Sequence, residues 1–312
     1  MAALLAGLKY YTHQITAVVT VTDNGGSSGI LRNDFDMVAP GDIRNCLIAL
    51  ADVDPLLAKA FQYRFPEGEF KGHCFGNLFM TVLTKIVGSF EDSVRALNVL
   101  LNVRGKVIPA ANAKVSLVAH HGDGTKSTGE VQISRSRKRI ERVEIRPSPV
   151  EMSAEIREAV QSADLFLFGP GSLFTSVVPN LLLGGLMSAV KANGGQTVYI
   201  GNLMTQPGET DGFRLSDHIR ALRRHVGGDF PDCVIAQSGG LPAKVLEKYR
   251  AEGAKPVPND LGRYEEFKNI RVISRNFFRD GDVARHDPSV LAQVIGQEFL
   301  QPIARAKRRL GT

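Results

Sequence analysis

The stretch ITAVVTVTDNGGSSG, residues 15–29, begins as a run of apolar and β-branched residues and ends in a loop of glycines, serines and one aspartate. The first half is typical of a buried β-strand. Glycines allow positive φ angles that turn several backbone N–H groups toward one point, and serine hydroxyls add further donors. The stretch therefore predicts a strand followed by an anion-binding loop, although it is not a P-loop because no Gly-Lys-Ser or Gly-Lys-Thr follows.

Apolar segments alternate with helix-like segments along much of the remaining chain. Buried-strand patterns occur in DLFLFG (164–169), QTVYIGN (196–202) and DCVIAQS (232–238), and each is flanked by segments with helical periodicity. Parallel strands that are covered on both faces are continuously apolar. This rhythm therefore predicts an α/β fold with a parallel sheet and helices on both faces.

Residues 54–146 depart from this rhythm. Helix-like segments follow one another without an intervening strand, and Asp54 and Ser89 have the sequence context of N-caps. Residues 114–146 show alternation without a helical period, which predicts a small antiparallel β excursion with the basic run RSRKRIER (135–142) as a strand edge protected by charge. We expect a single α/β domain over residues 1–312 with an inserted helical and β segment at about 54–146.

Composition limits the functional classes. The 312 residues have a formal net charge of +6, which favours anionic ligands such as nucleotides, and the basic residues are too scattered to predict nucleic-acid binding. The sequence has no apolar run of about twenty residues and no secretory signal pattern, so we expect no membrane span. Cys46, Cys74 and Cys233 are far apart and outside any CxxC pattern, which favours a cytoplasmic location and argues against disulfides or a zinc site.

Candidate binding residues are concentrated in loops that follow predicted strands, because ligands of such folds bind at the carboxyl ends of the strands. Residues 22–29 follow the strand predicted in the opening stretch. GPGSLFTSVVPNLL (169–182) follows DLFLFG, and GNLMTQPGETDG (201–212) follows the strand that begins at residue 196. Two predicted helix starts, GDIRNC (41–46) and KGHCFGN (71–77), add further polar residues.

Arg44 is expected in the first turn of a helix, where a guanidinium can form a two-pronged contact with phosphate beside free backbone donors. The sequence has no nucleophile elbow, catalytic-triad order or metal-ligand spacing, so we predict no catalytic residue and no required cofactor. The predicted ligand-binding residues are Asp23, Asn24, Gly25, Gly26, Ser27, Ser28, Asp42, Arg44, Asn45, His73, Asn77, Gly169, Gly171, Ser172, Thr175, Asn180, Asn202, Thr205, Gln206 and Glu209.

The chain resembles the YvcK-like proteins, the gluconeogenesis factor or UPF0052 family, a branch of the superfamily that includes 2-phospho-L-lactate transferase, CofD. The resemblance extends over about residues 4–239 and depends on the order and spacing of six motifs: ITAVVTVTDNGGSSG, GDIRNCLIALAD, FQYRF, GHCFGNL, GPGSLFTSVVPNLL and NLMTQPGET. It implies a Rossmann-like three-layer fold. It also implies a regulatory protein rather than an enzyme, one that binds a UDP-sugar. A homo-oligomer is compatible with the sequence but is not indicated by any motif. The family's role is in cell shape and in the partitioning of cell-wall precursors on gluconeogenic carbon sources.

A transferase of the CofD type is the alternative that the resemblance leaves open. In that reaction a flavin-like acceptor alcohol attacks a nucleotide-activated phospholactate, and Asp23 helps to hold Mg²⁺ against the phosphates. This sequence has Asn24 where the family commonly has a second aspartate, and the loss of one carboxylate weakens a divalent-metal site. A dinucleotide oxidoreductase has little support, because no GxGxxG follows a strand.

The first residues, MAALLAGLKYY, are typical of a helix, whereas family members have a strand and a GGGTG-type loop before this helix. Both are absent here, and we expect a chain shortened by a misassigned start codon or by a real truncation. The first strand of a doubly wound sheet is usually central, so its absence predicts unpaired apolar edges on the neighbouring strands. It also removes one phosphate-binding loop, which predicts low solubility and a lower nucleotide affinity than in full-length relatives.

Overall fold

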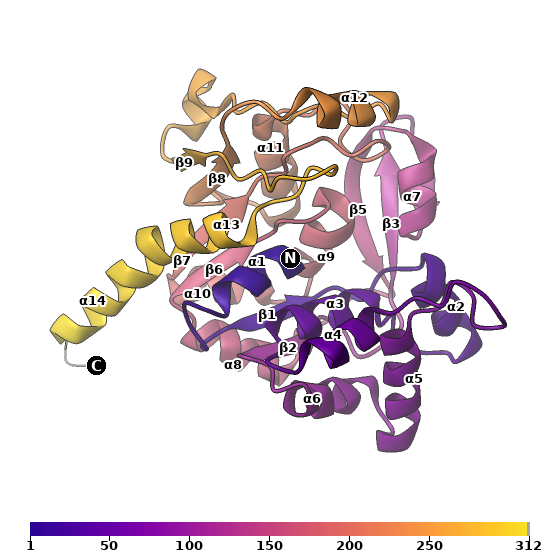
Figure 1. Cartoon of the computed structure of the whole chain (residues 1–312). Helices are drawn as coiled ribbons and strands as arrows, with labels where there is room; N and C mark the ends of the chain where they lie inside the picture. Colours follow the sequence, from indigo (N-terminus) through magenta and orange to yellow (C-terminus); the bar gives the residue numbers. More distant parts are fainter. Residues whose placement is uncertain (311–312) are drawn as a thin grey trace.

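The computed structural model describes residues 1–310 and has a four-stranded parallel sheet at its centre (Figure 1). The strand order is β6 (Leu165–Phe168), β7 (Gln196–Ile200), β8 (Cys233–Gln237) and β9 (Arg271–Arg275). All three pairings are parallel, as continuously apolar strands joined by helices require. The predicted α/β fold with a parallel sheet is therefore confirmed.

A second parallel pair, β1 (Thr16–Val19) with β2 (Lys106–Pro109), is separate from the four-stranded sheet. β2 lies within the segment 54–146, so that segment contributes a parallel strand as well as the helices and β excursion expected of it. Within the described residues, β1 pairs only with β2 and β6 only with β7. β1 of the two-stranded sheet and β6 of the four-stranded sheet therefore each have one unpaired edge.

Helices cover both faces of the four-stranded sheet. Successive side chains of strand β7 point to opposite faces and pack against different helices. Val198 and Ile200 pack in one apolar cluster with α1 (Ala2–Leu8) and α13 (Pro288–Ile295). Tyr199, between them, points to the opposite face, where its hydroxyl lies 2.8 Å from Nδ1 of His218 on α11 (Leu215–Val226). The helices α8 (Ala154–Ser162) and α10 (Leu186–Asn193) form a further apolar cluster with β2.

A group of helices follows β1 and precedes β2. It consists of α2 (Gly26–Asp34), α3 (Gly41–Leu50), α4 (Pro55–Gln62), α5 (Phe75–Val87) and α6 (Phe90–Leu100). Two of the predicted caps are present, because Asp54 Oδ1 accepts from Leu56 N at 2.7 Å and Ser89 Oγ accepts from Asp92 N at 3.0 Å. Such caps satisfy first-turn N–H groups that have no partner within the helix.

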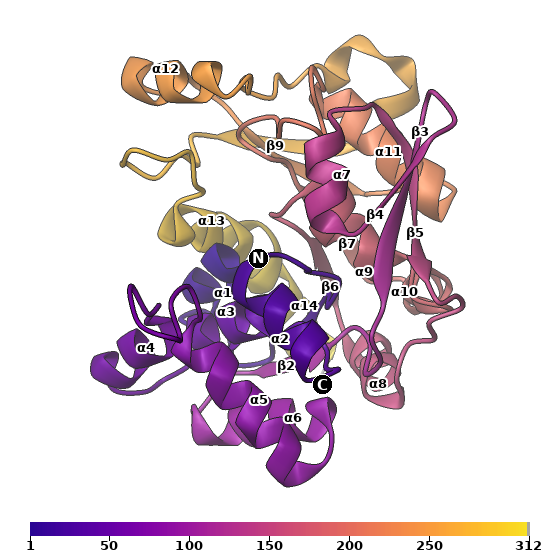
Figure 2. The same ribbon diagram turned by 90° about the vertical axis from the view of Figure 1, so that its right-hand side faces the viewer.

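The β excursion is an antiparallel sheet of order β4 (Lys126–Thr128), β3 (Ser116–His121) and β5 (Ile140–Arg146), beside the body of the protein (Figure 2). The sequence prediction missed α7 (Glu130–Ser136), which lies between β4 and β5. The basic run 135–142 is therefore not one strand edge, since it spans the end of α7, a loop and the start of β5. A helix of seven residues is too short to show a clear helical period.

The remaining elements complete the connections. They are the π-helical turn Leu173–Val177, α9 (Val178–Leu181), α12 (Ala243–Ala251), the short 3₁₀ turns Leu261–Arg263 and Glu265–Phe267, the π-helical turn Gly296–Leu300 and α14 (Gln301–Leu310). In the described part of the chain, every helix is too short or too polar to cross a membrane.

Candidate functional site

The loop after β1 packs against the start of α3. Asp23 Oδ1 accepts from Gly25 N at 2.8 Å, a contact that holds the loop in a tight turn. A Cβ at Gly41 would lie 2.5 Å from Ser28 Oγ and 3.2 Å from Asp23 Oδ2, so the absence of a side chain there lets the two segments meet. The structure corrects one expectation: Ser27 and Ser28 lie in the first turn of α2, which begins at Gly26, and not in a loop.

Ser27 joins this loop to the start of α5. Its hydroxyl lies 3.3 Å from His73 Nδ1, and it also accepts from the Cys74 backbone N–H and from Asn77 Nδ2, each at 3.3 Å. Ser27 and Asn77 are buried. The structure therefore brings together residues from three predicted segments, 22–29, 41–46 and 71–77.

Arg44 lies at the centre of this cluster. Its guanidinium donates through Nη1 to Asn77 Oδ1 and through Nη2 to Asn45 Oδ1, both at 2.7 Å. Its Nε is buried and has no hydrogen-bond partner in the protein. Gly76 is required beside it, since a Cβ there would lie 2.7 Å from Arg44 Cδ. A buried donor without a partner is costly, so this N–H is a candidate for a contact with an anionic ligand.

The loops after β6 and β7 form a second, acceptor-rich cluster. Gln206 Nε2 donates to Ser172 Oγ at 2.6 Å, and Asn202 Nδ2 donates to Gln206 Oε1 at 3.2 Å. Both loops leave the same edge of the sheet because their strands are parallel and adjacent. Hydroxyl and amide groups in this arrangement suit the hydroxyls of a sugar or ribose.

Glu209 is the buried carboxylate of the second cluster. Ser134 Oγ donates to its Oε1 at 3.1 Å, and Thr175 Oγ1 lies 3.4 Å from both of its carboxylate oxygens. Burial raises the pKa of Glu209 to about 7, and the hydroxyl contacts lower it by less. The residue therefore changes protonation near neutral pH.

Glu130, on α7, is a functional candidate that sequence reasoning missed. Burial, and then the charges of Asp23, Asp42 and Glu209, raise its pKa to about 8. Burial and the charge of Asp23 also raise the pKa of Asp42. Glu130 thus lies between the two clusters. Nothing in the sequence indicates this, because α7 has no clear periodic pattern and its contacts are to distant segments.

Three predicted residues have mainly structural contacts. Thr205 ties its loop to residue 255, since Thr205 N donates to Lys255 O at 2.7 Å and Lys255 N donates to Thr205 Oγ1 at 2.9 Å. Asn180 donates from Nδ2 to Ser176 O at 2.8 Å and lines an apolar cavity between β1 and β6. Asn24 Oδ1 accepts from Val131 N at 3.1 Å and so caps the start of α7.

Asn24→Ala is expected to lower the free energy of unfolding by about 1 kcal/mol, because α7 loses its cap. The measurement is urea unfolding together with hydrogen exchange at the Val131 amide, which should become faster. Asn112→Ala, at an exposed position, is the control and should leave Val131 exchange unchanged. Equal exchange rates in the wild type and Asn24→Ala would contradict the capping role.

Gly208 is a second point at which α7 meets the loops. Its φ is +84°, and a Cβ there would lie 1.9 Å from the carbonyl oxygen of Ser134. Gly212 has a similar φ of +70° but has no atom within 4 Å of the corresponding position. Gly208→Ala and Gly212→Ala therefore share the cost of a left-handed conformation, and only the first adds a steric clash.

Gly208→Ala is expected to reduce the free energy of unfolding by about 1–2 kcal/mol more than Gly212→Ala does, which is the usual cost of overpacking. Chemical unfolding of the two variants measures this difference directly. If the two alanines cost the same, the close contact between α7 and this loop does not limit stability.

The metal site of the transferase alternative depends on Asp23. Within residues 1–310, no three His, Cys, Asp or Glu side chains are grouped so that they could hold a metal ion. Mg²⁺ often binds through one or two carboxylates and completes its shell with phosphate oxygens and water. Asp23, with Asp42 beside it, suits only such a nucleotide-dependent site.

The protein is an α/β protein whose polar loops lie at the carboxyl ends of parallel strands, the place where such folds commonly bind ligands. The sequence profile of the family described as 2-phospho-L-lactate transferase CofD matches residues 1–278. The chain therefore belongs to this family, and the resemblance inferred from its motifs is confirmed.

Similar proteins within the family are named gluconeogenesis factors. The chain is 42% identical over 297 residues to the gluconeogenesis factor of Halalkalibacterium halodurans, covering 95% of this chain and 92% of that protein. It is 41% identical over 302 residues to that of Bacillus subtilis, covering 95% and 93%. A crystal structure of a upf0052 family member from Bacillus halodurans superimposes with a TM-score of 0.91 at 42% identity, covering 94% of this chain and 95% of that one.

Proposed function

We propose that this protein is a regulatory binding protein for a UDP-sugar, acting in the cytoplasm to partition cell-wall precursors and maintain cell shape on gluconeogenic carbon sources. The names of its relatives support a link to gluconeogenesis. The nucleotide sugar as ligand is supported by two unlike clusters, one after β1 of the two-stranded sheet and one after β6 and β7 of the four-stranded sheet.

The observation that supports this ligand most directly is the buried Arg44 guanidinium with an unpartnered Nε. It lies beside the first turns of α2 and α3, where backbone N–H groups have no helical acceptor. The cluster around Arg44 therefore suits phosphates. The cluster of Ser172, Gln206 and Glu209 suits hydroxyls, so a ligand with a diphosphate and a sugar matches both sides.

Isothermal titration calorimetry with UDP-glucose, UDP-N-acetylglucosamine, UMP and glucose tests the proposal. We expect saturable binding of at least one UDP-sugar, with UMP and glucose each binding at least about tenfold more weakly, because each fills only one cluster. Equal affinity for UMP and the UDP-sugars would contradict a role for the second cluster. The absence of any binding would contradict the proposal.

The CofD-type transferase is the second candidate, and the proximity of Asp23 and Asp42 favours it. The discriminating assay incubates the protein with Mg²⁺, a nucleotide-activated phospholactate and a flavin-like acceptor. We expect no turnover. Turnover without saturable UDP-sugar binding would contradict the proposed binding function and support the transferase.

The cellular role is tested by deletion of the gene and complementation. The deletion strain should lose its normal shape on a gluconeogenic carbon source and keep it on glucose, and the intact gene should restore it. Normal shape on both carbon sources would contradict the cellular part of the proposal.

A further inference from the structure

Three aromatic side chains meet on the loop between α4 and α5. Tyr63 and Phe65 belong to the motif FQYRF (61–65), and Phe70 follows in the same loop. The rings of Tyr63 and Phe65 are edge to face with centroids 5.2 Å apart, and those of Phe65 and Phe70 are tilted at 5.6 Å. We call Tyr63, Phe65 and Phe70 the aromatic platform.

The platform is open to solvent. Tyr63 is 51% and Phe70 is 55% exposed, and Phe65 between them is half-buried. Single exposed apolar residues are normal on a protein surface, but a contiguous exposed group of large apolar side chains is typical of a binding surface. Aromatic rings also have flat faces on which another flat ring can stack.

The backbone places the platform beside the polar cluster of the first loop. Residues 63–65 form a short antiparallel pair with residues 73–75, in which Phe65 N donates to His73 O at 3.0 Å. Phe65 and His73 are opposite each other in this pair, so their side chains share one face. His73 Nδ1 in turn lies 3.3 Å from Ser27 Oγ. The platform is therefore continuous with the cluster that contains Ser27.

Local hydrogen bonds hold the loop in this shape. Arg64 Nη1 donates to Gly72 O, and His73 N donates to Phe70 O at 2.8 Å. Gly72 has a φ of +84°, which glycine adopts at little cost. A surface that is ordered before a ligand arrives loses less conformational entropy on binding.

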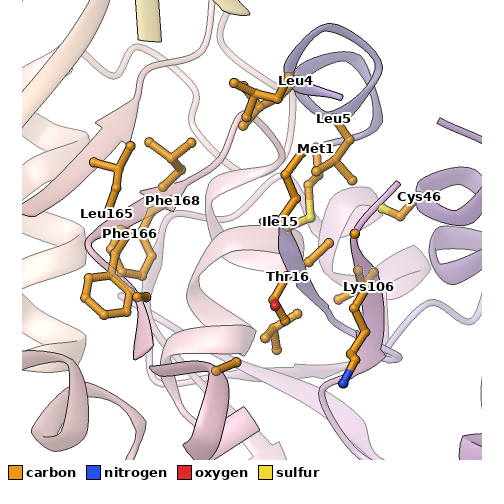
Figure 3. A pocket seen from close by; sticks show the side chains of 18 of the residues that line it. Met1, Leu4, Leu5, Ile15, Thr16, Cys46, Lys106, Leu165, Phe166 and Phe168 are labelled. Atoms are coloured by element: carbon orange, nitrogen blue, oxygen red, sulfur yellow. The ribbon is translucent and has the colours of Figure 1, made fainter. Parts of the chain in front are cut away.

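The largest cavity among the described residues offers a different environment. Figure 3 shows it from close by, with Leu165, Phe166 and Phe168 along one wall. Apolar side chains of α1, α8 and α10 also line it. A nucleobase enclosed there would place its carbonyl and N–H groups against apolar side chains, which is costly unless each group finds a partner. On the half-exposed platform the edges of a base stay in contact with water.

We propose that the aromatic platform binds the nucleobase of the ligand by stacking, an inference that rests on the proposed function. In a UDP-sugar the diphosphate joins the sugar at one end to the nucleoside at the other. A diphosphate beside Arg44, with the sugar at the cluster of Ser172 and Gln206, leaves the nucleoside to extend from the cluster around Arg44. The platform adjoins this cluster. Stacking uses the face of the base, so the platform contributes affinity and does not select among bases.

The test uses the absence of tryptophan from the chain. Phe70→Trp places a single tryptophan on the platform, and a base stacked on its indole quenches the fluorescence. We expect a saturable decrease in emission when UDP is added. 5,6-Dihydro-UDP keeps the hydrogen-bonding edge of uracil but has a puckered ring that is not aromatic. Its apparent affinity should be at least about tenfold lower.

Tyr10→Trp is the matched control for the fluorescence. Tyr10 is 73% exposed and lies between α1 and β1. Met1, at the opposite end of α1, donates to Pro170 O at 2.5 Å just after β6, so Tyr10 lies away from the strand-end loops. UDP should leave the emission of Tyr10→Trp unchanged.

Two further variants separate the ring from its apolar volume. Phe70→Tyr keeps an aromatic face, and Phe70→Leu keeps an apolar side chain without one. Calorimetry with UDP-glucose and UDP-N-acetylglucosamine should show wild-type affinity for Phe70→Tyr and about ten- to a hundredfold weaker binding for Phe70→Leu. Absence of UDP-sugar binding by the wild type would overturn the proposed function and the platform together. UDP-sugar binding by the wild type with unchanged emission of Phe70→Trp, or with equal affinities of Phe70→Leu and Phe70→Tyr, would overturn the platform alone.

Discussion

Replacing Arg44 with lysine is expected to weaken UDP-sugar binding by about ten- to a hundredfold. Arg44 reaches Asn77 and Asn45 through its two terminal nitrogens, which leaves the buried Nε for the ligand. Lysine keeps the positive charge but cannot hold both amide oxygens and a phosphate oxygen in one plane. A hydrogen bond to a charged group contributes about 1.5–3 kcal/mol, which corresponds to this range of affinity.

Arg104→Lys is the matched control. Arg104 also forms a two-pronged contact, through Nε at 3.1 Å and Nη2 at 2.7 Å to Asp52 Oδ2, but it lies outside the strand-end loops. Its replacement should leave UDP-sugar affinity unchanged. Circular dichroism and thermal unfolding establish that both variants fold. Wild-type affinity in Arg44→Lys would show that the guanidinium does not contact the ligand.

The parts of the site that could be predicted from sequence are those with local signals. A glycine- and serine-containing loop directly after an apolar strand identifies residues 22–29, and a polar loop after the strand 196–200 identifies Gln206 and Glu209. Parallel strands bring such loops to one edge whatever their separation along the chain. The contacts of Ser27 with His73 and Asn77 do not follow from this rule, because residues 71–77 belong to the connection between α4 and α5 and do not follow a strand.

The parts that could not be predicted depend on long-range contacts. α7 begins with Val131 N donating to Asn24, more than a hundred residues earlier in the chain, and its buried apolar residue is Ile133. A helix stabilised in this way has no amphipathic pattern of its own. Its Glu130 therefore could not be assigned to the site. The position of β2 was missed for a similar reason, since its partner β1 is also distant in sequence.

Glu209→Gln is expected to remove the part of the pH-dependent loss of stability that Glu209 itself causes between about pH 4.5 and pH 7. Burial raises the pKa of Glu209 in the folded protein from 4.5 to about 7. Below this interval both the folded and unfolded chains are protonated at Glu209. Within it the unfolded chain ionises first, so the free energy of unfolding falls as the pH rises. Above pH 7 both forms are ionised, and the loss remains constant at about 3 kcal/mol.

Glutamine has nearly the same shape and can accept a hydrogen bond from Ser134 or Thr175, but it does not ionise. Urea unfolding at pH 5, 6.5 and 8 should therefore show that the free energy of unfolding of the wild type declines steeply as the pH rises. That of Glu209→Gln should decline less steeply. Glu130, whose pKa is raised to about 8, accounts for the slope that remains and extends it toward pH 8.

Glu158→Gln, at an exposed position on α8, controls for the loss of a negative charge and should keep the wild-type slope. If the free energies of unfolding of Glu209→Gln and the wild type decline in parallel as the pH rises, Glu209 is already ionised across the measured pH range. The loops would then hold a buried carboxylate, and that carboxylate would repel a phosphate at neutral pH. A shallower slope for Glu209→Gln instead means that Glu209 is protonated at pH 6.5 and can donate a hydrogen bond, which is compatible with an anionic ligand beside Arg44.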